Sequence, residues 1–226
     1  MSRRFPLAAL APLLLVPAVS LGDTSVGVRA GTLGAGAELS YAVSQSFALR
    51  LAADTYTPRE RTVTQEDVDY DVKAKLRTGS LLADWFPFAN NFRISLGAIL
   101  NRNKVTATGK ANANGQFVID GQPFNASDIG TLTADVTFKK TAPYFGIGYG
   151  RPINSGLSFI FDFGVMFQGA PKSTLTSTCN PNTASGGAAT CNQIQSALAA
   201  EQATLDDDLS KFKYYPILSF GLAYTF

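Results

Sequence analysis

Apolar and polar positions alternate along most of this chain, in segments of about ten residues. The clearest segment covers 157–168, where the apolar set is Leu157, Phe159, Phe161, Phe163, Val165 and Phe167. A period of two is the pattern of a β-strand, because successive side chains point to opposite faces. The same pattern predicts eight strands, at 24–32, 33–42, 46–56, 72–86, 92–101, 141–150, 157–168 and 214–226.

The connections between these strands alternate in length. Short connections rich in turn-forming residues lie at 43–45, 87–91 and 152–156, and long ones lie at 57–71, 102–135 and 170–211. The tight connection at 32–34 is an exception, because a long one is expected there. An even number of strands, with one short-loop end and one long-loop end, is typical of an outer-membrane barrel.

The two alternating sets differ in size, and this predicts which face meets lipid. The bulky apolar set would face hydrocarbon, while the opposite set, rich in glycine and charge, would face the lumen. A soluble barrel of the lipocalin type, with the bulky set inside, is the structural rival. We therefore predict an all-β fold, an eight-stranded antiparallel transmembrane outer-membrane β-barrel with short periplasmic turns and long extracellular loops.

The first 22 residues are typical of a secretory signal peptide. Arg3 and Arg4 precede an apolar run from Phe5 to Val19, and a small-residue cleavage site places Asp23 at the mature start. An uncleaved membrane anchor is the alternative, but the run is shorter than the ~20 residues that a spanning helix needs. We expect a signal peptide at 1–22 and a barrel at 23–226.

Composition narrows the classes of function. The chain has no His, and its 19 Lys and Arg nearly balance 17 Asp and Glu. The missing His excludes His-based catalytic triads and His-ligated zinc, and the near-neutral charge gives no indication of nucleic-acid binding. Because no nucleophile–base pair, phosphate loop or metal cluster is visible, we expect a protein that is not an enzyme and needs no cofactor.

The two cysteines, Cys179 and Cys191, lie in the last long connection. In an exported chain such a pair predicts a disulfide, whereas a metal site or catalytic thiol would need further ligands nearby. After them, Asn192 could cap a short helix, with Ile194, Leu198 and Leu205 roughly on one side.

Charged residues in the inward-facing set are the only candidates for chemistry. They are Arg29, Glu38, Arg50, Asp54, Asp84, Arg93 and Asp162. They could plug the lumen by mutual salt bridges, as side chains fill most eight-stranded barrels, or line a narrow polar path for small cationic or zwitterionic solutes. The many inward glycines favour some open space in the lumen.

The final strand carries a polar–x–Gly–x–x–aromatic–x–aromatic pattern at Ser219, Gly221, Tyr224 and Phe226. This pattern resembles the C-terminal insertion signature of bacterial outer-membrane barrels. The resemblance implies recognition by the barrel-assembly machinery, outer-membrane lipid as the surroundings, and a location in the outer membrane of a Gram-negative bacterium.

Further stretches carry a family resemblance: residues 27–37 running on to Ser40, 142–149, 169–176, and the last strand from Tyr214. They resemble the small outer-membrane channels of the carbapenem-resistance-associated (CarO) type, described as ornithine-uptake porins. The resemblance implies an eight-stranded barrel that passes basic amino acids and possible carbapenem entry, and it assigns no binding residue. A weaker likeness is to the outer membrane protein W group, with its apolar side-opening conduit.

These observations predict a narrow passive channel for small zwitterionic or cationic solutes, in which Asp54→Asn or Asp162→Asn would change the cation preference. A second hypothesis is a closed-lumen structural or surface-binding barrel that acts through its long extracellular loops. A third is a soluble periplasmic carrier of apolar ligands.

Overall fold

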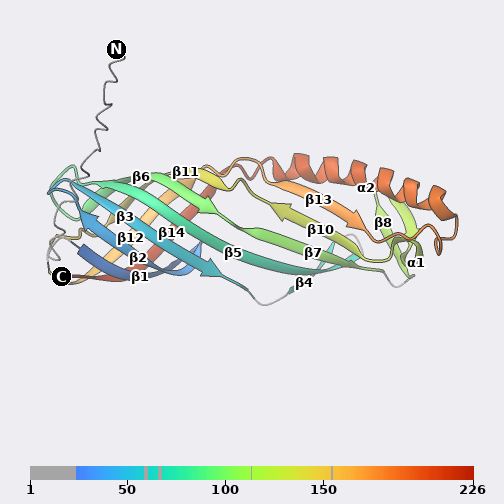
Figure 1. Cartoon of the computed structure of the whole chain (residues 1–226), viewed down its shortest axis with the longest axis horizontal. Helices are drawn as coiled ribbons and strands as arrows, with labels where there is room; N and C mark the ends of the chain where they lie inside the picture. The colour runs from blue at the N-terminus through green and yellow to red at the C-terminus, as the bar shows by residue number, and fades with distance from the viewer. Residues whose placement is uncertain (1–23, 59–60, 66–67, 113, 154) are drawn as a thin grey trace, which may run out of the picture.

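The protein is described by a computed structural model that covers residues 24–226, apart from 59–60, 66–67, 113 and 154. The predicted signal peptide and its cleavage site before Asp23 lie outside the described residues. The described chain forms a β-barrel that continues at one end into a long sheet covered by a helix (Figure 1).

Eight antiparallel strands close the barrel in the order β5–β3–β2–β1–β14–β12–β11–β6, and β6 pairs again with β5. They are β1 (Thr24–Gly31), β2 (Gly34–Ala42), β3 (Phe47–Tyr56), β5 (Val68–Trp85), β6 (Phe92–Asn101), β11 (Thr141–Tyr149), β12 (Gly156–Met166) and β14 (Tyr215–Thr225). The first and last strands are hydrogen-bonded neighbours, with Val26 opposite Tyr224. The predicted eight-stranded antiparallel barrel is confirmed.

The outer surface of the barrel is apolar. Along β12, Leu157 and Phe159 are 72% and 51% exposed, whereas Ile160 and Asp162 between the outward positions are nearly fully buried. A continuous band of exposed aliphatic and aromatic side chains around a closed barrel suits a hydrocarbon environment. The predicted orientation is therefore confirmed, and the lipocalin-type rival is wrong because it would bury the phenylalanines.

The three short connections lie together at one end of the barrel. Arg151, in the connection between β11 and β12, joins them. Its guanidinium donates hydrogen bonds to the carbonyl oxygens of Ala89 (2.8 Å) and Gln45, each in a different short connection. The same guanidinium lies over the ring of Phe86, 5.6 Å from its centroid. One side chain therefore links all three short turns.

The long connections between barrel strands are present as predicted, but they fold into regular structure that the sequence did not predict. β5 runs beyond the barrel and is joined there by β4 (Arg61–Gln65), β7 (Lys104–Lys110), β10 (Leu132–Thr137) and β13 (Lys172–Ser177). The remaining elements are β8 (Gln116–Ile119), β9 (Gln122–Asn125), α1 (Ala126–Ile129) and α2 (Gly187–Leu209). We call these elements, with the part of β5 beyond the barrel, the extension.

The extension has its own hydrophobic core. Buried apolar residues from the β8–β9 hairpin, α1, β10 and α2 meet there: Phe117, Ile119, Phe124, Ile129, Leu132, Ile194, Ala197 and Leu198. The predicted helix exists, but it begins at Gly187 rather than near Asn192. Ile194 and Leu198, predicted on one side of the helix, lie in this core, and Leu205 is half-buried. The predicted disulfide between Cys179 and Cys191 is present and ties α2 to the segment that follows β13.

Helix α2 lies along the free edge of β13, the last strand of the sheet (Figure 1). The backbone N–H of Ser173 donates to Asp206 Oδ1 (2.7 Å), and that of Leu175 donates to Gln202 Oε1 (3.1 Å). Side chains of the helix thus replace a neighbouring strand, which protects an edge that would otherwise pair with other chains. No helix among the described residues is long and apolar enough to cross a membrane.

Two carboxylates that hold the extension together have lowered pKa values. Hydrogen bonds from the backbone N–H and hydroxyl of Ser173 lower the pKa of Asp206, and the same groups of Ser185 lower the pKa of Asp128. Because the folded state favours the charged forms, their stabilising contribution is complete above the ordinary aspartate pKa of 3.8. It is lost as the pH falls through the lower folded-state values.

We expect acidification below about pH 4 to loosen α2 from β13 without affecting the barrel. Hydrogen exchange, corrected for intrinsic rates, should show falling protection at Ser173 and Leu175 while the amides of β12 keep theirs. The variant Asp206→Asn, which removes the titrating group, should show a weaker pH response at Ser173. An unchanged pH response in this variant would contradict the assignment.

Candidate functional site

All seven charged residues predicted to face the lumen lie in it, and they contact one another. They come from β1 (Arg29), β2 (Glu38), β3 (Arg50, Asp54), β5 (Asp84), β6 (Arg93) and β12 (Asp162). Each is at most 8% exposed. The strands bring them together because alternate residues of every barrel strand point to the same interior. We call these seven residues the lumen cluster.

Arg50 lies at the centre of the lumen cluster and is completely buried. Its Nε and Nη2 donate to the two carboxylate oxygens of Asp84, at 2.9 and 3.0 Å. Its Nη1 donates to Asp162 Oδ2 at 2.8 Å and lies 3.5 Å from Glu38 Oε2. One guanidinium therefore joins carboxylates from three other strands, spanning the interior from β5 to β12.

Two further arginines extend the cluster on either side of Arg50. Arg29 forms a two-pronged pair with Asp54, in which Nε lies 2.8 Å from Oδ1 and Nη2 lies 2.5 Å from Oδ2. Arg93 donates to Asp162 Oδ1 at 2.9 Å and to the Gly150 carbonyl oxygen at 2.6 Å. The ion pairs thus form a continuous network across the lumen.

The lumen cluster holds four carboxylates against three guanidinium groups, so its formal charge is −1. Neutral donors help to stabilise the carboxylates: Ser95 Oγ donates to Asp84 at 2.5 Å and Ser219 Oγ to Asp162 at 3.4 Å. Buried charges are tolerated only when they are paired and hydrogen-bonded in this way. The network is therefore a tightly held plug.

An apolar plug lies next to the lumen cluster. It consists of Leu33, Leu82, Ile99, Ala142, Tyr144, Met166 and Ile217, with Tyr215 against it. The tight connection at 32–34 turns Leu33 into the lumen, where it is 4% exposed. The alternation does place Ile99, Tyr144 and Met166 at inward positions, but a plug of apolar residues was not predicted from the sequence. The signal was weak because isolated apolar residues interrupt a mostly polar set.

The expectation that inward glycines leave open space is wrong. A methyl group at Gly148 would lie 2.8 Å from Arg93 Nε and 2.9 Å from Asp162 Oδ1, and one at Gly164 would meet the Tyr144 ring. The glycines thus make room for large neighbouring side chains rather than for solute. The cavity between the two plugs has a volume of about 10 Å³, roughly enough for one water molecule.

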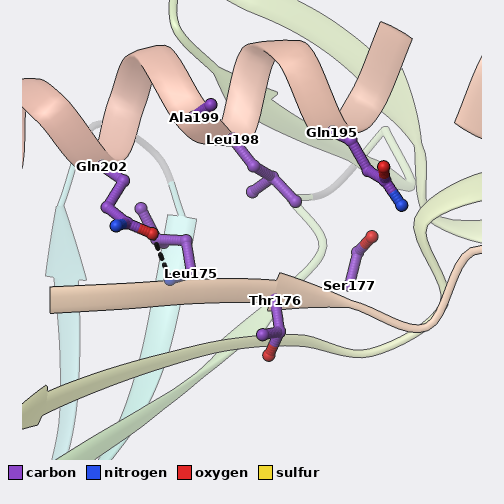
Figure 2. Close-up of a pocket in the computed structure, with 7 residues that line it drawn as sticks. All are labelled: Leu175, Thr176, Ser177, Gln195, Leu198, Ala199 and Gln202. Atoms are coloured by element: carbon purple, nitrogen blue, oxygen red, sulfur yellow. Dashed lines mark hydrogen bonds between the residues drawn. The ribbon is translucent and has the colours of Figure 1, made fainter. Parts of the chain in front are cut away.

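A second hollow lies in the extension, between β13 and α2 (Figure 2). Its volume is about 260 Å³, and it is lined by Leu175, Thr176, Ser177, Gln195, Leu198, Ala199 and Gln202. Gln202 turns toward β13 and accepts the Leu175 N–H (Figure 2). The lining contains no titratable side chain, so the hollow offers hydrogen bonds but no acid–base chemistry. The described residues contain no group of three potential metal-ligating side chains.

Ser219, Gly221 and Tyr224 of the C-terminal pattern lie on β14, and Phe226 follows its last residue. The four residues divide between the inner and outer faces of the barrel. Ser219 is buried in the lumen and Gly221 also faces inward, whereas Tyr224 and Phe226 are 51% and 53% exposed on the outside. The rings of Tyr224 and Phe226 contact each other edge to face at 5.4 Å. Recognition of this segment by the assembly machinery stays a prediction.

Replacing the central guanidinium tests whether the lumen cluster holds the barrel together. Arg50→Gln leaves Asp84 and Asp162 without their main partner, and we expect a loss of about 3–5 kcal/mol in unfolding free energy. Lys110→Gln is the matched control, because its pair with Asp71 is half-exposed and worth at most about 1 kcal/mol. Urea unfolding in detergent, followed by heat-modifiable migration on SDS gels, measures both. Equal stability of the two variants would contradict a structural role for Arg50.

Comparisons with known proteins agree with this architecture. No protein-family model and no curated protein matches the chain. Among solved structures it is similar to CarO2 of Acinetobacter baumannii, at 19% identity and a TM-score of 0.56, covering 90% of this chain and 98% of that one. It is also similar to CarO of the same bacterium, at 19% identity and a TM-score of 0.54, covering 89% and 97%. The resemblance to carbapenem-resistance-associated barrels is thus confirmed at the level of the fold.

Proposed function

We propose that this protein is an outer-membrane barrel with a closed lumen that acts through the extension it holds outside the cell. The observation that carries the proposal is the complete burial of the Arg50 guanidinium between Asp84 and Asp162, on opposite parts of the barrel wall. A solute would have to displace these ion pairs and then pass the apolar residues around Ile99 and Met166. Outer-membrane barrels direct their long connections outward, so the extension faces the surroundings.

The construction of the extension supports a role at the surface. A flexible loop would not need a separate hydrophobic core, a disulfide and a helix that satisfies the edge of β13. Each of these features lowers the conformational freedom of the extension, and a preorganised surface loses less entropy on binding than a loose one. We therefore propose that the extension presents a rigid binding surface, and that its partner is a molecule on another cell or on a phage.

Two measurements test this proposal together. Purified wild-type protein in planar bilayers should show no conductance steps. A variant in which a short Gly-Ser linker replaces residues 180–208 should keep the barrel, shown by heat-modifiable migration, but reduce phage adsorption or adhesion to host cells. Regular conductance steps in the wild type, or unchanged adsorption and adhesion in the variant, would contradict the closed-lumen surface role.

A narrow channel is the second candidate, and the excess carboxylate of the lumen cluster favours it. If side-chain movements opened a path along Asp54 and Asp162, the formal charge of −1 would attract cations rather than anions. Passage of basic amino acids such as ornithine, and entry of carbapenems, would agree with the carbapenem-resistance-associated resemblance. Such opening requires a conformation in which Arg50 leaves at least one of its partners.

Liposome swelling separates the channel from the closed barrel. For a channel, ornithine should enter wild-type proteoliposomes, and Asp162→Asn or Asp54→Asn should lower the preference for cations over anions, because the cluster loses its excess negative charge. Asp208→Asn, in the extension and paired with Lys211, is the control and should leave the preference unchanged. Swelling no faster than in protein-free liposomes would exclude the channel.

A further inference from the structure

Six cationic side chains form two adjacent rows on the outer face of the protein, directly beyond the apolar surface of the barrel. The row nearer the barrel contains Arg77, Arg102 and Lys139, and the next row contains Lys75, Lys104 and Lys172. All six are exposed. We call these six residues the basic collar.

Backbone hydrogen bonds set the three residues of the first row at the same level of the sheet. The N–H of Arg102 donates to the Arg77 carbonyl oxygen at 2.9 Å, so these two residues are cross-strand neighbours. The N–H of Asn101 donates to the Lys140 carbonyl oxygen at 2.8 Å, which sets Lys139 at the level of Arg102. Three cations therefore follow one another around the barrel end: Arg77 lies on β5, Arg102 just after β6 and Lys139 just before β11.

The second row continues across four strands of the extension. Lys75 on β5 lies opposite Lys104 on β7, and Lys104 lies opposite Thr137 on β10. Thr137 in turn lies opposite Lys172 on β13. Like charges directly opposite each other destabilise a sheet, and only one collar residue, Lys104, forms an ion pair within the described chain, with Asp135 at 3.0 Å. Lys172 also interacts electrostatically with Asp206. The collar thus carries more positive charge than its carboxylate neighbours among the described residues compensate.

The collar belongs to the same face of the sheet that meets hydrocarbon. On β5, alternate residues keep one direction from Leu81, which is 56% exposed, through Gly79 to Arg77 and Lys75. With a rise of about 3.3 Å per residue, Arg77 lies roughly 13 Å and Lys75 roughly 20 Å along the strand from Leu81. Because barrel strands are tilted, these positions fall where the hydrocarbon ends and lipid headgroups begin.

We propose that the basic collar binds the phosphate groups of an anionic lipid in the leaflet that surrounds the extension end of the barrel. The two arginines can hold phosphate oxygens with two hydrogen bonds each, and the lysines add point charges around them. Binding of phosphate would offset the repulsion between neighbouring cations. The proposal does not depend on whether the lumen is closed or conducts.

Native mass spectrometry of the folded full-length protein in detergent tests the collar, with diphosphorylated lipid A as the probe. Wild type should retain the lipid, and Arg77→Gln/Arg102→Gln should weaken its binding about 30-fold, since each cation near a membrane surface contributes roughly a fivefold factor. Arg77→Lys/Arg102→Lys keeps the charge and should retain most of the affinity. Lys110→Gln, which removes a cation farther along the extension, should bind like wild type.

Three outcomes would overturn the proposal. They are equal binding of the same glycolipid without its phosphate groups, equal binding by the Arg77→Gln/Arg102→Gln variant, and binding of free inorganic phosphate as tightly as the lipid. The last result would indicate an ion site rather than a lipid site. Heat-modifiable migration of every variant shows that it is folded before binding is compared, so a loss of binding cannot result from a collapsed barrel.

Discussion

The charge pairs around Arg50 are the interaction on which the rest of the barrel depends. An eight-stranded barrel encloses too little space for bulk water, so every ionised group inside it must find its partner within the wall. Arg50 meets this requirement by joining Asp84 on β5 and Asp162 on β12, strands that are not neighbours. The inward glycines follow from the same constraint, because Arg93 and Tyr144 occupy the space that larger side chains would need.

The two faces of the sheet exchange their polarity where the barrel becomes the extension. Within the barrel, β5 presents Leu81 outward and Asp84 inward; beyond it, the same strand presents Lys75 outward and packs Tyr70 against the extension core. On the inside, the cause is a change of neighbours: α2 and the β8–β9 hairpin replace the opposite barrel wall and supply the apolar core. A continuous strand thus serves two environments without a break.

The quality of the sequence predictions followed the strength of the local signal. The segment 157–168 predicts both a strand and the face that points outward, because bulky apolar side chains alternate with small or charged ones. Segment 104–110 has only Val105 and Ala107 opposite lysine and threonine, which is too weak a contrast to distinguish a strand from a polar loop. It forms a strand because β5 extends beyond the barrel and pairs with it through backbone hydrogen bonds.

By itself, the sequence determined the strand periodicity, the face that meets lipid, the seven charges of the interior and the pairing of Cys179 with Cys191. These are local matters, decided by alternation, residue size and the small number of cysteines. Only the tertiary structure decided that the lumen is closed and that cations gather in two rows beyond the apolar outer surface of the barrel. Arg50 and Asp162 are 112 positions apart in the sequence. Likewise, Lys75, Lys104 and Lys172 lie on three different strands. Such neighbours are set by strand order and register, which no local pattern specifies.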